Sequence, residues 1–142
     1  MICRDAIDTD LENIMRMLHT SNLPSVDCEE HLDNFIIVEV NNKIIGIGGL
    51  EVYGNVGLLR SIVVDADSRK NGVGEIIYTL IAKKASNVGV NILYLLTESA
   101  EKYFSGLGFS VLDRDEIPAS IKETKQFKEL CPSSAKVMSR VL

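Results

Sequence analysis

The sequence lacks several features that would point to particular classes of protein. Basic residues are in the minority, with 15 Lys and Arg against 20 Asp and Glu, so the formal net charge is −5. Nonspecific nucleic-acid binding needs a basic surface, which disfavours that class. No apolar run approaches the roughly 20 residues of a membrane span, and the first residues lack the layout of a signal peptide. We therefore expect neither nucleic acid nor a membrane among the partners.

Cysteine is scarce, and its spacing excludes a zinc site of the CxxC kind. Cys3, Cys28 and Cys131 form an odd, widely spaced set, which fits reduced thiols in a cytoplasmic protein. Neither His19 nor His31 has a carboxylate or cysteine at metal-ligand spacing, so solvent or structural roles are expected for both. We expect no metal.

Length and composition favour a single folded domain. The 142 residues are 46% apolar and 25% charged, close to the average for soluble globular proteins. A chain of this size buries roughly 68–70% of its unfolded surface, which is enough for a sizeable core. We therefore predict one domain over residues 1–142.

Turn residues divide the chain into strands and helices. A capping box at Thr9 and Glu12, followed by an apolar stripe, predicts a first helix that ends before Pro24. Weaker periodicity predicts a second helix over 25–34. Further helices are expected from the glycine loop to about Asn87 and over 99–106. Strands are expected over 1–6, 35–40, 43–53, 58–65, 91–96, 108–113 and 135–141, the last as an edge or closing strand. The order β-α-α-β-β-β-α-β-α-β-β predicts an α+β fold, with a mixed, mostly antiparallel central sheet flanked by helices.

The most informative segment joins a buried strand to a helix through a glycine loop. This loop has the sequence Arg69-Lys70-Asn71-Gly72-Val73-Gly74. N–H groups at a helix N-terminus lack intrahelical partners, and the helix dipole favours negative charge there. The spacing excludes a GxxxxGK[ST] phosphate loop, and the preceding antiparallel strands argue against a dinucleotide-binding GxGxxG unit. The segment alone fits either a phosphate site or a turn that caps a helix.

The order of motifs resembles the GNAT superfamily of acyl-CoA-dependent N-acyltransferases over essentially the whole chain. The family loop [Gln/Arg]-x-x-Gly-x-[Gly/Ala] is matched by Arg69, Gly72 and Gly74, and Leu-Gly-Phe by 107–109. The resemblance implies that residues 69–74 bind the CoA pyrophosphate. It also implies that the strand segment 62–64 pairs with the pantetheine arm. The cofactor-binding residues expected on this basis are Ile62, Val63, Val64, Arg69, Lys70, Asn71, Gly72, Val73, Gly74, Thr97 and Phe104.

A small subgroup associated with arsenic-resistance operons is the most similar part of that superfamily. The similar phrases are Gly49-Leu50-Glu51-x-Tyr53-Gly54, Leu58-Leu59-Arg60-Ser61, Leu95-Leu96-Thr97 and Phe127-x-x-x-Cys131-Pro132-x-Ser134-Ala135. The resemblance to this subgroup implies a thiophilic ligand site at Cys131, and a small core cysteine is the alternative. A looser similarity extends to the acyltransferase domain of N-acetylglutamate synthases.

Two departures from the superfamily pattern concern the catalytic acid and base. Phe104 stands where many members place a tyrosine that protonates the leaving thiolate. Tyr103 is one residue earlier, about 100° away around a helix. Leu58 replaces the glutamate that some members use as a base. Neither standard group can therefore be carried over, and positioning and electrostatics could supply much of the rate.

Four other residues are candidates for the site. Glu51 interrupts an apolar strand and either takes a proton from the acceptor amine or is an exposed residue at a strand end. Arg60 either binds a substrate carboxylate or forms a structural ion pair, with Glu51 as one partner. Ser61, expected to face away from Arg60, is a weaker substrate candidate. Thr97 stands where many members use an asparagine near the cofactor.

These observations predict an acetyl-CoA-dependent N-acetyltransferase that acts on a primary amine of a small molecule, such as an amino acid or an analogue. Two alternatives stay open. One is an acyl-CoA sensor or interaction module that has lost its chemistry. The other is a protein N-acetyltransferase, because the acidic surface would attract a basic peptide. A homodimer formed through the C-terminal strand is also considered.

Overall fold

The described residues form one mixed sheet of seven strands. A computed structural model describes residues 1–130 and 133–142, so Cys131 lies outside the described residues. The strand order is β1-β2-β3-β4-β5-β7-β6, and the only parallel pair in the described sheet is β4 with β5. The α+β fold with a mostly antiparallel sheet is thus confirmed. The strands are β1 (Ile2–Asp5), β2 (Phe35–Val40), β3 (Lys43–Tyr53), β4 (Val56–Val64), β5 (Ile92–Thr97), β6 (Ser110–Leu112) and β7 (Lys136–Val141).

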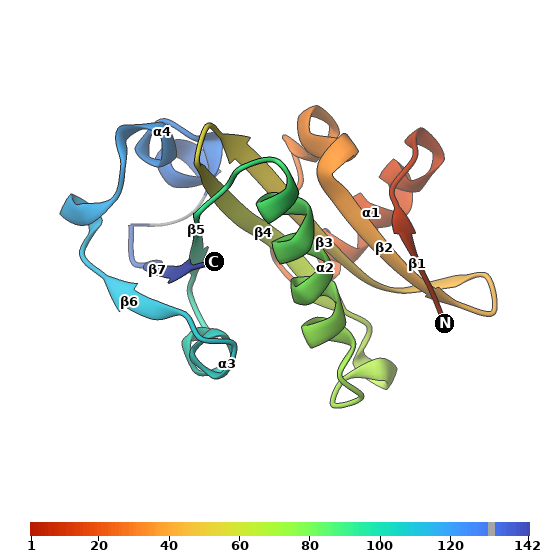
Figure 1. The fold of residues 1–142 in the computed structure, drawn as a ribbon. Helices are drawn as coiled ribbons and strands as arrows, with labels where there is room; N and C mark the ends of the chain where they lie inside the picture. Colours follow the sequence, from red (N-terminus) through yellow and green to blue (C-terminus); the bar gives the residue numbers. More distant parts are fainter. Residues whose placement is uncertain (131–132) are drawn as a thin grey trace.

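Helices cover both faces of the sheet (Figure 1). The faces can be told apart by alternate residues of β2. Ile36 and Val38 pack with α2 (Val73–Asn87), whereas Phe35 and Ile37 pack with α1 (Leu11–Thr20) and the 3-10 segment η2 (Cys28–Asn34). A third apolar cluster, on the α1 side, joins α4 (Ala119–Lys122) to β4, β5 and β7. The remaining short elements are η1 (Asp8–Asp10), η3 (Ala66–Ser68), α3 (Glu101–Gly106), η4 (Arg114–Glu116) and the π-helical segment η5 (Gln126–Leu130).

Glycines in β3 allow α2 to lie close against the sheet. A β-carbon at Gly48 would lie 2.8 Å from the Cδ1 atom of Ile81 and closer still to Ile77. Both isoleucines are fully buried in the core under α2. A larger residue fits at position 48 only if these isoleucine side chains shift or the helix moves away from the sheet.

Gly48→Val should therefore lower the free energy of unfolding by about 1–3 kcal/mol, the usual cost of overpacking a core. Equilibrium urea denaturation followed by circular dichroism measures this change. Gly106→Ala is the matched control, because a β-carbon at Gly106 has no neighbour within 4 Å. If Gly48→Val had the same unfolding midpoint as the wild type, the close packing of α2 on β3 would be contradicted.

The predicted capping box at Thr9 and Glu12 is wrong. α1 begins at Leu11 without a side-chain cap. The turn before it is instead closed by Asp10, whose carboxylate accepts a hydrogen bond from the Ile7 N–H at 2.8 Å. Arg4 on β1 binds both oxygens of the same carboxylate, at 2.7 and 2.9 Å. An ion pair with a neighbouring strand therefore decides where this helix starts.

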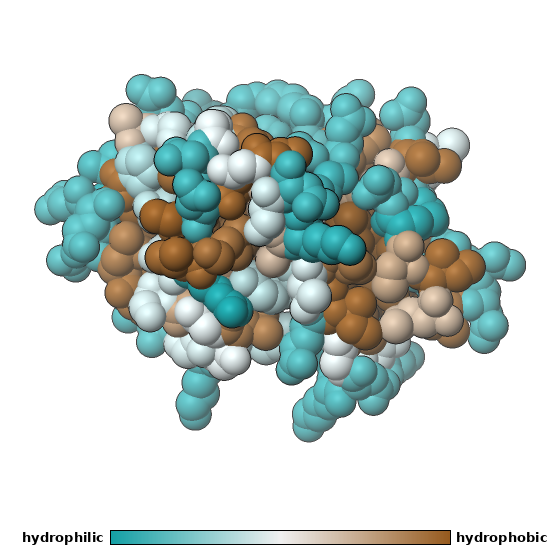
Figure 2. Space-filling model, in the orientation of Figure 1, coloured by the Kyte–Doolittle hydropathy of each residue, from teal (hydrophilic) through white to brown (hydrophobic). Residues whose placement is uncertain are grey.

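The C-terminal strand, expected as an edge or closing strand, lies inside the sheet, so the edge alternative is wrong. β7 pairs with β5 on one side and with β6 on the other. The short β6, which follows α3, pairs antiparallel with β7 and so covers its outer side. A homodimer by edge pairing of β7 thus loses its basis, since the edges of the described sheet are β1 and β6. Figure 2 shows apolar side chains on both sides of α2, and the exposed apolar residues at the two ends of the sheet include Ile2 and Val111.

Among residues 1–130 and 133–142, no helix combines the length and the apolar character that a membrane span requires.

Candidate active site

The loop that leads into α2 has the backbone of an anion site. Gly72 adopts a φ of 78°, in the left-handed region where residues with a side chain are strained. A β-carbon added there would meet no atom within 4 Å, so the space above the loop is open. The first N–H groups of the 15-residue α2 have no intrahelical partner. With the helix dipole, they favour a bound phosphate.

Side chains of the predicted loop divide into a solvent face and a core face. Arg69, Lys70 and Asn71 are exposed, whereas Val73 is buried beneath α2. The Arg69 Nε–H donates a hydrogen bond to the Val64 carbonyl at 3.1 Å. This bond fixes the loop to the end of β4. The Arg69 and Lys70 side chains therefore lie near the free N–H groups at the start of α2.

The sheet opens between β4 and β5, and the opening extends toward this loop. β4 and β5 are paired only from Val56 to Leu58 and from Ile92 to Tyr94. β4 then continues to Val64 and β5 to Thr97 without further pairs between them. The β4 segment 62–64, predicted to bind the cofactor arm, therefore has one backbone edge free of a neighbouring strand. Thr97 ends β5, and its hydroxyl accepts a hydrogen bond from the Ala100 N–H at 3.0 Å.

Tyr103 and Phe104 extend from α3 in different directions. Phe104 packs against Phe109, with ring centroids 6.0 Å apart, beside the core under α2. Tyr103 is 43% exposed, and its hydroxyl lies so close to Gly74 that a β-carbon there would overlap it. Burial and the nearby Glu75 raise the pKa of the Tyr103 phenol. The Tyr103 hydroxyl thus reaches the glycine loop, although Phe104 and not Tyr103 occupies the position of the family tyrosine.

A bulge in β4 sets the directions of Arg60 and Ser61. One residue of β3 opposes two of β4 between the pairs Gly49–Arg60 and Ile47–Val63. Ser61 has a φ of 60°, which is uncommon for a residue with a side chain. The prediction that Ser61 faces away from Arg60 is wrong, because the Arg60 Nε–H donates to the Ser61 Oγ at 3.0 Å. The bulge breaks the alternation on which that prediction was based.

Arg60 lies in a buried ion-pair cluster with two carboxylates. Its Nη1 contacts Asp27 at 2.6 Å and Glu51 at 2.8 Å, and its Nη2 contacts Asp27 at 2.7 Å. The three side chains are only 1–2% exposed. The structural ion pair considered for Arg60 is therefore present, and Asp27, just before η2, is a partner that the sequence did not indicate. Glu51 is buried, not exposed at a strand end.

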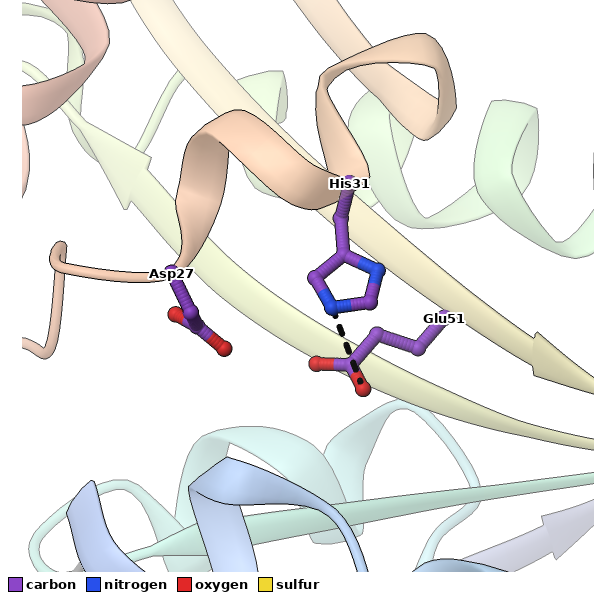
Figure 3. A group of neighbouring side chains, drawn as sticks. All are labelled: Asp27, His31 and Glu51. Carbon is purple, nitrogen blue, oxygen red and sulfur yellow. Dashed lines mark ion pairs between the residues drawn. The ribbon is translucent and has the colours of Figure 1, made fainter.

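Tyr53 and His31 complete the cluster around Glu51. The Tyr53 hydroxyl donates a short hydrogen bond to Glu51 Oε1. The His31 Nε2 lies 3.6 Å from the same oxygen, and its side chain is 22% exposed. Figure 3 shows the imidazole reaching from η2 toward the Glu51 carboxylate, with Asp27 to the left at the start of the same segment. In the register of β3 and β4, Glu51 faces Leu58, the last residue of β4 that pairs with β5. The cluster thus lies next to the start of the opening.

Opposing effects set the pKa values in the cluster. Burial by itself would raise the pKa of Asp27, but hydrogen bonds to Arg60 and its charge outweigh burial and keep this pKa below its ordinary value. Burial would likewise lower the pKa of Arg60, and the two carboxylates reverse that effect. Burial, followed by the hydrogen bond to Glu51, raises the pKa of Tyr53 far above its ordinary value. Tyr53 therefore keeps its proton at neutral pH.

Asp27, His31 and Glu51 each offer a ligand atom, and these atoms lie within 4.8 Å of one another. The Arg60 guanidinium contacts both carboxylates, so a divalent cation would compete with a positive charge already bound. These donors are those of an ion-pair cluster. That the protein uses no metal stays a prediction.

The model of the acetyltransferase (GNAT) family matches residues 5–109. The chain belongs to this family. The match includes the loop, the open edge of β4, α3 and the cluster around Glu51. Membership in the GNAT family, predicted from the sequence, is therefore confirmed.

Curated relatives of this GNAT chain are named amino-acid acetyltransferases. The chain is 28% identical over 102 residues to the protein of Enterobacter sp. (strain 638), which covers 70% of this chain and 23% of that protein. It is 26% identical over 92 residues to the protein of Neisseria meningitidis serogroup A, covering 63% and 21%. The chain thus spans less than a quarter of the length of these relatives.

Solved structures share the fold. Rv2747 from Mycobacterium tuberculosis, solved in complex with CoA and NLQ, has a TM-score of 0.83 at 20% identity, covering 100% of this chain and 99% of that one. N-acetylglutamate synthase from Neisseria gonorrhoeae, in complex with coenzyme A and N-acetyl-glutamate, has a TM-score of 0.85 at 22% identity. That match covers 99% of this chain and 35% of the synthase.

Sequence reasoning missed Asp27 and His31. Asp27 lies 33 residues before Arg60, and His31 lies 20 residues before Glu51, so sequence spacing gives no sign of either contact. Only the packing of η2 over β3 and β4 brings them together. An arginine within an apolar strand was the available signal, because it requires buried acidic partners.

Proposed function

We propose that this GNAT domain transfers an acetyl group from acetyl-CoA to the primary amine of a small molecule. When bound, acetyl-CoA supplies the thioester carbonyl that the amine attacks. The residues fit this co-substrate: the N–H groups after Gly72, with Arg69 and Lys70, suit its pyrophosphate. The free edge of β4 at residues 62–64 suits its extended, amide-containing arm.

The observation that carries the choice of an amine is the charge of the buried cluster. Two carboxylates, Asp27 and Glu51, surround one guanidinium, which leaves one negative charge uncompensated. An amine arrives protonated, and this charge attracts it. Glu51 then removes one proton, which frees the nitrogen lone pair for attack on the carbonyl. Because Arg60 is occupied by both carboxylates, we assign it the task of holding Glu51 in place, and an acid group on the acceptor would be bound elsewhere.

Amino acids are the first acceptors to test, because the curated relatives are named amino-acid acetyltransferases. An amine panel of L-glutamate, L-glutamine, L-lysine, putrescine and phenethylamine, incubated with acetyl-CoA, covers acidic, neutral and basic acceptors. Release of CoA thiol that depends on one of these amines supports the proposal. Binding of CoA without thiol release would instead identify a sensor. The similarity to the arsenic-resistance subgroup stays a prediction, and the panel does not depend on it.

CoA and acetyl-CoA should both raise the melting temperature of the protein, and ATP should change it little. A ligand at 100 times its Kd stabilises the fold by about 2.7 kcal/mol, which moves the midpoint by several degrees. Gly72→Val should remove the shift, because its side chain would occupy the open space above the loop.

Gly89→Val is the matched control for this melting experiment. Gly89 also has a positive φ and no neighbour within 4 Å, but it lies beyond the other end of α2. The two variants carry similar backbone strain, so only the one at Gly72 should lose the CoA shift. An unchanged CoA shift in Gly72→Val would refute the assignment of the loop.

A further inference from the structure

The Glu51 carboxylate is almost fully buried, so few groups are placed to take a proton from it. Its side chain is 2% exposed, and Arg60 holds Oε2 at 2.8 Å. Tyr53 and His31 both approach Oε1. An ionised carboxylate has about four acceptor positions, so one position on Oε2 stays available for the acceptor amine. A base that works repeatedly must also release its proton. A neighbouring group that reaches water can accept this proton and pass it to solvent.

His31 is the neighbour of Glu51 that meets this requirement. Its side chain is 22% exposed, whereas those of Asp27 and Arg60 are 1% exposed. In Figure 3 one ring nitrogen faces the Glu51 carboxylate and the other points away from it. An imidazole in this arrangement can accept a proton on one nitrogen and release one from the other.

On the basis of the proposed function, we propose that His31 relays the amine proton from Glu51 to water. The N–H bond of the ammonium breaks as an O–H bond forms on Glu51. After the product leaves, Glu51 turns its protonated oxygen toward His31 and closes the 3.6 Å gap to the ring, and that O–H bond breaks as the N–H bond at His31 Nε2 forms. The imidazolium releases a proton to water, so the cluster regains its starting charge. The relay needs no further reactant, and it gives His31 a role that its place in the sequence does not indicate.

The other polar groups around His31 are unsuited to the relay. Asp27 is held by two hydrogen bonds from Arg60. Tyr53 keeps its phenolic proton, and Cys28 is buried with a raised thiol pKa, caused chiefly by burial. On η2 and just before it, the titratable and charged groups besides His31 are Asp27, Cys28, Glu29, Glu30 and Asp33. The neighbouring strands add Glu51 and Tyr53 on β3 and Arg60 on β4, and Glu30 pairs with Lys125.

His31→Gln should lower kcat with the fastest amine of the panel by about 10²-fold, at the low end of what general acid–base catalysis contributes. The KM for acetyl-CoA and the melting shift with CoA should not change, because the ring lies away from the loop. The pH profile of kcat should differ between the wild type and His31→Gln, because only the wild type has the ring in the path of the proton.

Added imidazole should restore part of the rate of His31→Ala and should not accelerate the wild type. A purely structural role of the ring would produce neither the rescue nor the altered pH profile. His19→Gln is the matched control, since His19 contacts Ser25 away from the cluster and the chain has two histidines. Its rate and pH profile should equal those of the wild type.

The outcomes separate the relay from the proposed function. If the wild type releases no thiol with any amine, the proposed function fails. If the wild type is active, and His31→Gln has the same kcat and pH profile, the relay is overturned while the function stands. Loss of rate in His31→Ala without imidazole rescue, in protein that keeps the CoA shift, also overturns it.

Discussion

Glu51→Gln should lower kcat/KM for the amine by about 10²–10⁴-fold, the range that general acid–base catalysis supplies. Glutamine has nearly the same shape and keeps an oxygen acceptor toward Arg60, but it does not take the amine proton. Asp27 still neutralises the guanidinium, so the fold should persist. Initial rates of thiol release over a series of amine concentrations measure the effect.

The melting shift with acetyl-CoA should be the same in Glu51→Gln as in the wild type, because Glu51 lies away from the loop. Glu39→Gln is the matched control: Glu39 pairs with Arg4 at 3.4 Å, far from the opening, and its variant should keep the full rate. If Glu51→Gln kept the wild-type rate, the base would have to be another group.

Arg60→Leu should be the most destabilising single change in the cluster. It leaves Asp27 and Glu51 buried without the guanidinium, and breaking a buried ion pair in this way costs about 3–5 kcal/mol. Urea denaturation at pH 7 measures the loss. Lys125→Met, which breaks the exposed pair with Glu30, is the control and should leave the unfolding midpoint unchanged.

The loss in Arg60→Leu should depend on pH. In the wild type the Asp27 pKa is below its ordinary value. The stability from this pair is therefore complete above the ordinary carboxyl pKa and is lost as pH falls through the lower, folded value. Without Arg60, burial raises the pKa of Asp27, so protonation relieves the variant in acid. The difference between the two proteins should shrink as pH falls, and a constant difference would contradict the ion-pair explanation.

The parts of the fold that the sequence predicts are those set by local patterns. β-Branched residues and a turn at Asn41-Asn42 locate β2 and β3, and the helical apolar stripe locates α2. The position of the glycine loop could also be predicted, because its two cations and two glycines lie within one six-residue segment. Each of these signals lies within about twenty residues of chain.

The errors arise where distant contacts decide. Arg4 engages Asp10 and so replaces the predicted capping box, while β6 covers β7 and removes an expected edge. The bulge turns Ser61 toward Arg60, against the expected alternation. The segment 114–130 carries few periodic residues, so α4 and η5 were not predicted. In the site, Asp27 and His31 reach Glu51 and Arg60 only through tertiary packing.

The short pairing of β4 with β5 has a mechanical consequence. Within the sheet, the backbone pairing between its two parts, β1–β4 and β5–β7, involves only three residues on each strand. An extended arm bound along the free edge of β4 would fill the gap between the two parts of the sheet, where β4 and β5 no longer pair. Ligand affinity would then depend on how rigidly the two parts of the sheet are held relative to each other. A substitution that loosens the junction between these two parts would weaken ligand binding without touching any residue that contacts the ligand.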